Sequence, residues 1–342
     1  MLTLVSDAIE TTEYHTAGEP FRIVADAGLT FEGATVADKR DYAPHTASLE
    51  RLRTMLCREP RGHADMYGCF IVEPDDADAD FGALFWHNDG YSTACGHGTM
   101  ALGAWAIQSG RLRADPDGTT EVVIDVPSGR VRTRVTQVAG ITTGIAFENV
   151  PSYPVARAYD VQLARGRVTV DVAFAGALYA SVSASQLGLR VTPEHVGDLR
   201  ALGREIKWAL NVTPVAQHEL DPRLGGIYGT IIYDDLGETL DGPHQRNVTV
   251  FADGRIDRSP CGSGTAARLA LLAQDGRLTP GRVLTHDSII GTRFRAHYER
   301  ADLDGYPEAA VVAIVEGVAH QIGRATFVLD PSDPIGTGFL LS

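Results

Sequence analysis

Residues 95–108 read CGHGTMALGAWAIQ, and residues 261–274 read CGSGTAARLALLAQ. In each stretch a cysteine is followed by Gly-x-Gly-Thr and then by a segment that is apolar on almost every side. A helix with so little polar surface must be buried on most of its sides. The sequence therefore predicts two helices, over 99–108 and 265–273, each running through the middle of its own domain and wrapped by strands.

The two stretches are copies of one longer unit. Nine residues separate Phe85 from Cys95, and nine separate Phe251 from Cys261. The copies start 166 residues apart in a chain of 342 residues. This spacing fits two related domains better than an array of short repeats. We expect the division between them within residues 137–143.

The remaining sequence is rich in short runs of β-branched residues, broken by Gly, Pro and Asp. Strands are predicted over 22–24, 121–126, 131–135, 167–172, 229–233 and 247–251. Further helices are predicted over 47–58 and 193–211, with a weak helical signal at 185–187. The mixture indicates the α+β class.

Composition excludes several classes of partner. The net charge is −14, and Lys and Arg gather into no cluster of the kind that binds nucleic acid or an anionic membrane. No run of 18 apolar residues occurs, which argues against a membrane span. Residues 1–12 lack the basic and apolar regions of a secretion signal, so we expect a cytoplasmic protein. Its four cysteines are too few for a disulfide scaffold, match no zinc motif and should be reduced.

The position of Cys95 and Cys261 suits acid–base chemistry. Unpaired backbone N–H groups and the helix dipole favour negative charge at the start of a helix, which lowers the pKa of a thiol there. The neighbouring glycines let the backbone form a nest of N–H donors for a carboxylate. A single such cysteine is often just a buried residue, which is the interpretation we adopt for Cys57 and Cys69. Packing alone does not explain two copies.

If both helix N-termini converge on one cleft, they can hold the same substrate carboxylate. The thiols would then lie on either side of the α-carbon, one as thiolate base and the other as thiol acid. Such a pair can invert the α-carbon without a metal or a cofactor. The sequence thus predicts a small-molecule racemase or epimerase.

At these residues the chain resembles the proline racemase family, which includes proline racemases, hydroxyproline epimerases and trans-3-hydroxyproline dehydratases. The matching segments are HTAGEP (15–20), EPRGHADMYG (59–68), GYSTACGHGT (90–99) and DRSPCGSGT (257–265). The resemblance implies the fold of diaminopimelate epimerase, with two pseudo-symmetric α/β domains, each a curled sheet around a central helix. The active site would lie in the cleft between them. We assign domains to 1–140 and 141–317, with residues 318–342 returning to the first.

The resemblance also implies the roles of individual residues. Backbone groups of Gly96, His97, Gly262 and Ser263 would bind the substrate carboxylate, and His97 and Asp257 would hold the ring nitrogen. Phe85 and Phe251 would line the pocket for the pyrrolidine ring. From the sequence alone, Asp257 could equally close a turn, and the two phenylalanines could be core residues. Ala94 and Ser263 stand where the family commonly has Met and Thr, which leaves the size of the substrate open.

The expected substrate is proline or a hydroxyproline. In the family's dehydratases the second cysteine is typically threonine, so Cys261 favours the two-base epimerase; a trans-3-hydroxy-L-proline dehydratase is the alternative. A thiol redox protein and a catalytically silent imino-acid binding protein are further alternatives. The chain could form a homodimer, on which the sequence is silent.

Overall fold

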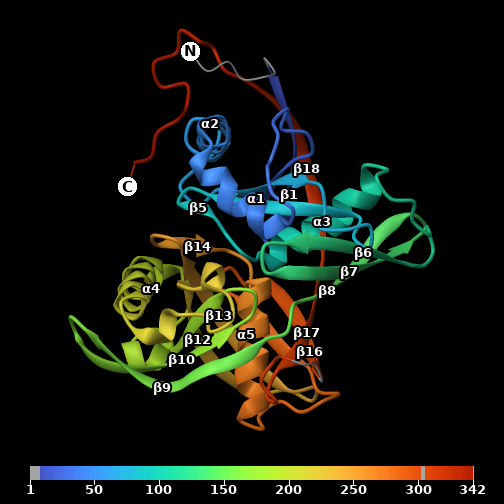
Figure 1. Cartoon of the computed structure of the whole chain (residues 1–342). Helices are drawn as coiled ribbons and strands as arrows, with labels where there is room; N and C mark the ends of the chain where they lie inside the picture. The colour runs from blue at the N-terminus through green and yellow to red at the C-terminus, as the bar shows by residue number, and fades with distance from the viewer. Residues whose placement is uncertain (1–7, 302–304, 342) are drawn as a thin grey trace. The chain divides into compact units, whose positions relative to one another are not determined.

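The computed structural model describes residues 8–301 and 305–341, and it confirms the α+β class. The chain divides into two compact units. The first comprises Met1–Thr16, Pro20–Thr143 and Val318–Ser342, and the second comprises Ala17–Glu19 and Gly144–Gly317. Figure 1 shows both units as sheets curled around helices. In the described residues, no helix is long and apolar enough to cross a membrane.

The first unit is built on eight strands and three α-helices in its described part. The strands are β1 (Ala8–Thr16), β2 (Glu19–Val24), β3 (Tyr67–Val72), β4 (Phe81–His87), β5 (Gly90–Tyr91), β6 (Thr119–Val126), β7 (Gly129–Val138) and β18 (Ala319–Val328). The helices are α1 (Val36–Tyr42), α2 (Ala47–Cys57) and α3 (Gly96–Gln108). Strand β1 pairs with β18 and with β2. The β2–β3 and β4–β6 pairs are parallel, whereas β3–β4, β4–β5 and β6–β7 are antiparallel.

The second unit contains the remaining strands and the helices α4 (Val196–Asn211) and α5 (Gly262–Gln274). Its strands are β8 (Ile141–Glu148), β9 (Tyr153–Leu163), β10 (Gly166–Phe174), β11 (Leu178–Ser183), β12 (Ile227–Glu238), β13 (Pro243–Phe251), β14 (Arg255–Asp257), β15 (Leu284–Ser288), β16 (Arg293–Arg300) and β17 (Val311–Gly317). The β11–β12 and β13–β15 pairs are parallel, whereas β12–β13, β13–β14 and β15–β16 are antiparallel.

The two units repeat one topology. Strands β2 to β7 follow the same order and the same sequence of parallel and antiparallel pairs as β11 to β16. In both units the cysteine helix follows the short hairpin strand and precedes the next parallel strand. The repeat found around the two cysteines thus extends over most of each unit.

Each cysteine helix occupies the middle of its unit. Helix α3 packs against β1, β6, β7 and β18, and helix α5 packs against β9, β10, β11, β16 and β17 (Figure 1). Every residue from Gly96 to Ala106 is buried, as is every residue from Gly262 to Leu272. Burial on all sides accounts for the weak amphipathicity of both helices.

The structure differs from the sequence prediction at several boundaries. Helices α3 and α5 begin at Gly96 and Gly262, so the glycines form their first turns. The segment at 185–187 belongs to a 3₁₀ turn (Ala184–Leu187), and 193–195 form another before α4. Helix α1 was not predicted, because its seven residues show little apolar periodicity. Strand β7 ends at Val138 and strand β8 begins at Ile141, so strand residues fill most of the stretch 137–143 in which we expected the division.

Candidate active site

Cys95 is the N-cap residue of α3, in ordinary extended backbone geometry with φ −156° and ψ 96°. Its carbonyl oxygen accepts the first helical hydrogen bond, from the Thr99 N–H at 2.9 Å, and a second bond from the Thr99 hydroxyl at 2.7 Å. The N–H groups of residues 96–98 therefore belong to the helix's first turn and make no intrahelical bonds. These donors and the thiol share one end of the helix.

The thiol of Cys95 contacts the imidazole of His97, with Sγ 3.6 Å from each ring nitrogen. The ring stands edge-on to Phe21 and Tyr67, at centroid distances of 5.7 and 5.2 Å. The His97 backbone is held as well, because the Thr16 hydroxyl donates to its carbonyl at 2.9 Å. His97 thus lies against the thiol, with contacts to both its ring and its backbone carbonyl.

Cys261 caps α5 in a different conformation. Its φ of 64° and ψ of 109° lie in a region that residues with a Cβ rarely adopt, at a cost of order 1–3 kcal/mol. The Gly264 N–H donates to its Sγ at 3.3 Å, and its own N–H donates to the Ser259 hydroxyl at 3.0 Å. Strain of this kind persists only where the surroundings hold it.

The turn before Cys261 is held by two carboxylates. Asp257 Oδ1 accepts from the N–H and the hydroxyl of Ser259, at 2.8 and 2.7 Å. Glu19, whose side chain is fully buried, accepts from the Arg258 N–H at 2.7 Å and from its guanidinium at 2.9 Å. Asp257 therefore closes a turn, the simpler of its two expected roles, and that turn leads directly to the thiol.

Burial raises the pKa of the Cys261 thiol well above its ordinary value, and the Asp257 carboxylate raises it further. Hydrogen bonds from the Gly264 N–H and the Thr249 hydroxyl act in the opposite direction, because both stabilise the thiolate. At neutral pH these surroundings favour the protonated thiol, the form that a general acid requires.

Behind this turn lies a buried cluster of polar side chains. The Asn247 amide nitrogen donates to the Pro260 carbonyl at 3.0 Å and to His286 Nε2 at 2.9 Å. His286 Nδ1 lies 2.8 Å from the Thr265 hydroxyl, which is 3.2 Å from the same Pro260 carbonyl. Since Nε2 accepts, Nδ1 must carry the proton. The side chains of Asn247 and Thr265 therefore both donate to the carbonyl of Pro260, the residue that precedes Cys261.

His286 should give the protein a measurable sensitivity to acid. Burial, with the Arg268 cation nearby, lowers the pKa of His286 to about 3. In the unfolded chain the pKa of this histidine is ~6.5, so between pH ~6.5 and ~3 the unfolded state binds a proton that the folded state does not bind. Above pH ~6.5 protonation of His286 costs the folded protein no stability. Below that pH the free energy of unfolding falls by up to ~1.4 kcal/mol per pH unit as the pH drops toward 3. Urea unfolding between pH 4.5 and 6.5 measures it.

The control for this prediction is His286→Asn, which removes the titrating group and leaves the other histidines in place. The variant should lose stability less steeply with acid than the parent over the same pH range. Equal slopes in the two proteins would contradict the assignment of a neutral, buried His286.

Ser263 lies in the first turn of α5, 1% exposed, and its hydroxyl has no hydrogen-bond partner among the described residues. A buried hydroxyl without a partner is uncommon and needs an explanation, such as a ligand. Ser263 was predicted to bind substrate only through its backbone. Its side chain supplies a second donor at the same helix end.

The two phenylalanines are less equivalent than their spacing suggests. Phe85 lies within β4, fully buried, and its ring is 6.2 Å from that of Phe21. Phe251 is the last residue of β13 and stacks on Tyr228 at 5.9 Å. The hairpins that follow differ, because β4 turns at residues 88–89 and β13 at 252–254. Both side chains are buried, and their contact with substrate stays a prediction.

The other two cysteines have no place in this chemistry. None of the four cysteines, all of which lie in the described residues, forms a disulfide, and Cys57 and Cys69 are fully buried. Burial raises the pKa of Cys57 to about 12 and that of Cys69 well above its ordinary value. Residues 8–301 and 305–341 contain no cluster of three or more His, Cys, Asp or Glu side chains arranged to hold a metal ion.

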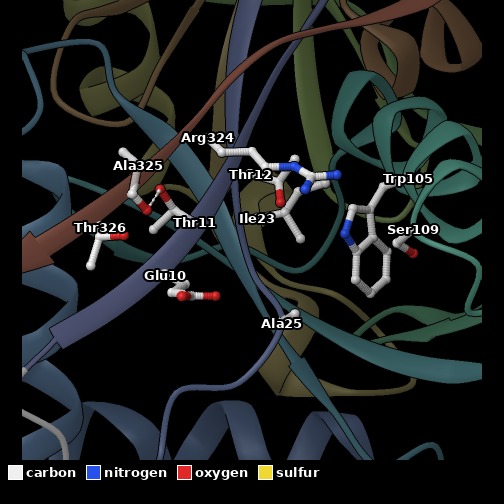
Figure 2. Close-up of a pocket in the computed structure, with 10 residues that line it drawn as sticks. All are labelled: Glu10, Thr11, Thr12, Ile23, Ala25, Trp105, Ser109, Arg324, Ala325 and Thr326. Carbon is white, nitrogen blue, oxygen red and sulfur yellow. Dashed lines mark hydrogen bonds between the residues drawn. The ribbon is translucent and has the colours of Figure 1, made fainter.

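A hollow of about 520 Å³ opens on the first unit, away from Cys95 (Figure 2). It is lined by strand residues of β1 and β18 together with Ile23, Ala25, Trp105 and Ser109. Trp105 lies ten residues, nearly three turns, after Cys95 along α3. Figure 2 shows no sulfur or imidazole among its lining side chains, so this hollow contains none of the predicted catalytic groups.

Comparison with known proteins identifies the family. The family model described as proline racemase matches residues 11–340. The chain belongs to the proline racemase family. The match includes both cysteine helices and all the predicted site residues.

Curated members of the family are similar over the full length. A trans-3-hydroxy-L-proline dehydratase of Bacillus cereus is 38% identical over 340 residues, covering 98% of this chain and 99% of the relative. A 3-hydroxyproline 2-epimerase of Burkholderia multivorans is 39% identical over 340 residues, with the same coverage.

Among solved structures, a hydroxyproline epimerase from Agrobacterium vitis with bound trans-4-hydroxy-L-proline has a TM-score of 0.90 at 26% identity. The match covers 98% of this chain and 95% of the epimerase. It confirms the expected fold over both units of this proline racemase family member.

Proposed function

We propose that this enzyme inverts the α-carbon of proline or a hydroxyproline, with Cys95 and Cys261 acting on opposite faces of that carbon. One thiolate removes the α-proton and the opposite thiol delivers another, and the roles exchange for the other configuration. The observation that carries the proposal is the repeat, because each unit places a cysteine at the N-cap of a buried helix. The chemistry uses only protein groups and needs both thiols reduced, as expected in a cytoplasm.

The helix ends supply the remaining requirements. The substrate carboxylate would accept hydrogen bonds from the backbone of Gly96, His97, Gly262 and Ser263, and we add the buried Ser263 hydroxyl. Removing the α-proton moves negative charge onto the carboxylate, so donors aimed there stabilise the transition state. His97 and Asp257 would hold the ring nitrogen, and Phe85 and Phe251 would contact the ring.

The second candidate is a trans-3-hydroxy-L-proline dehydratase, the activity named for several relatives at 38–40% identity. Both reactions begin by breaking the Cα–H bond. Elimination then breaks the C3–O bond, forms a C2–C3 double bond and releases water, whereas epimerisation returns a proton to the opposite face. Cys261 favours epimerisation, because a thiol there can donate that proton. The names of the relatives favour 3-hydroxyproline over the other substrates.

Proton NMR in D2O distinguishes these reactions. The protein, kept reduced, is incubated separately with L-proline, trans-4-hydroxy-L-proline and trans-3-hydroxy-L-proline. We expect loss of the α-proton signal with appearance of the opposite Cα configuration for at least one of them. Consumption of the 3-hydroxy compound alone, without an epimer, would establish the dehydratase instead. Binding without α-proton exchange would refute both.

A further inference from the structure

We propose that His286 and Thr265 are positioning residues for the Cys261 thiol. Through Asn247 and the Pro260 carbonyl they hold the strained backbone from which the thiol is presented. The inference rests on the proposed function for the thiol and concerns residues outside the expected set of substrate contacts.

The first step is that Cys261 needs external support. Its backbone, with φ 64°, lies where a residue with a Cβ is unfavourable, whereas Cys95 caps its helix at φ −156°. The two units therefore differ in the backbone conformation of the cysteine itself, the residue on which the proposed chemistry depends. An unfavourable backbone conformation that is kept at a reactive residue points to a function that requires it.

The second step is that hydrogen bonds concentrate on the residue before Cys261. The Pro260 carbonyl accepts from Asn247 Nδ2 at 3.0 Å and from the Thr265 hydroxyl at 3.2 Å. In the first unit the matching threonine, Thr99, donates to the carbonyl of Cys95 itself, at 2.7 Å. The second unit thus directs its threonine one residue earlier, onto the peptide bond that joins Pro260 to the strained cysteine.

The third step is that one imidazole orients both donors. His286, fully buried, accepts from Asn247 at Nε2 and faces the Thr265 hydroxyl with Nδ1, at 2.9 and 2.8 Å. The Nδ1–H of His286 donates to the Thr265 oxygen, so the Thr265 hydroxyl proton is left to donate to the Pro260 carbonyl. Asn247 Oδ1 also accepts from the Thr249 hydroxyl at 3.3 Å. Hydrogen bonds therefore hold the Asn247 amide group at both its nitrogen and its oxygen.

Thr265→Val tests the proposal, because it keeps the shape of the side chain and removes the hydroxyl. We expect kcat to fall at least about tenfold with KM changed less than about twofold, since a small misplacement of a reacting group costs rate. Thr265→Ser should restore most of the rate, because it returns the hydroxyl. Thr230→Val is the matched control: this buried threonine of the same unit donates to the Gly203 carbonyl at 2.8 Å, and its replacement should leave both constants unchanged.

His286→Phe should reproduce the loss in kcat, with folding checked by circular dichroism and thermal melting. If it does not fold, Thr265→Val and Thr265→Ser carry the test. Retention of kcat in Thr265→Val, an equal loss in Thr265→Ser, or an equal loss in Thr230→Val would overturn the proposal.

A measurement without substrate separates this inference from the proposed function. Alkylation by iodoacetamide, followed by peptide mapping, gives the rates for Cys95 and Cys261 in one sample. In Thr265→Val the Cys261 rate should change at least about fivefold while the Cys95 rate stays constant, because thiol reactivity follows its local surroundings. Unchanged ratios would refute the positioning role even in an enzyme that epimerises; changed ratios in a protein without α-proton exchange would refute only the proposed function.

Discussion

Cys95→Ser and Cys261→Ser should each lower the rate of α-carbon inversion by about 10²- to 10⁴-fold, the usual contribution of a positioned acid or base. A serine hydroxyl preserves the shape of the site but is a far weaker acid than a thiol, so it cannot take up and return the α-proton. Initial rates with each configuration of the substrate, by polarimetry or proton NMR, measure the effect. KM should change little, because the backbone donors proposed to bind the substrate carboxylate are unchanged in both variants.

The control for these variants is Cys57→Ser, which alters a fully buried thiol that donates to the Met66 carbonyl at 3.5 Å. It should lose stability and retain its rate. A Cys261→Ser enzyme that keeps the rate of inversion would refute the two-thiol mechanism. One that loses inversion and still eliminates water from trans-3-hydroxy-L-proline would show that the second thiol decides between epimerase and dehydratase.

The cysteine helices illustrate what the sequence alone could predict. Their apolar character on all sides indicated burial, and the matching spacing from Phe85 and Phe251 indicated a repeated unit. Both signals are local, since they depend on residues within one helix and one preceding strand. The structure then extends the repeat to six strands per unit, which single short runs could not reveal because strand pairing joins distant segments.

The hydrogen bonds that hold the turn before Cys261 could not be predicted from the sequence. Glu19 lies in a recognised motif, yet nothing local indicates that its carboxylate binds the Arg258 backbone 239 positions later. Asn247, Thr265 and His286 come from β13, α5 and β15, and only the fold brings them together. The positive φ of Cys261 could not be predicted either, because such backbones are expected at glycine and not at a residue with a Cβ.

The contacts of His97 were also beyond the sequence. Tyr67 and Phe21, whose rings pack against His97, carried no signal beyond being aromatic.

Gly98→Ala should reduce the rate of inversion by about 10²-fold, the cost expected when a reacting group is displaced by about 1 Å. A Cβ at this position would lie 2.6 Å from Phe21 Cζ and 2.7 Å from the Cys95 thiol, closer than real Cβ atoms approach. Helix packing leaves the new methyl group no other direction, so either the thiol or the Phe21 ring must move. Because Phe21 also holds His97, either shift disturbs the pair formed by the thiol and the imidazole. Overpacking should cost a further ~1–3 kcal/mol of stability.

The matched control is Gly103→Ala, on the same helix and equally buried. Its Cβ would lie 3.0 Å from Thr133 Cβ and 3.1 Å from a methyl group of Val135, so it meets β7 and no catalytic group. This variant should lose a similar ~1–3 kcal/mol from overpacking while keeping the rate of inversion per folded molecule. Urea unfolding together with initial rates separates the two effects. Equal losses of rate in both variants would mean that α3 acts only through its packing, whereas a loss confined to Gly98→Ala ties the rate to the space around the Cys95 thiol.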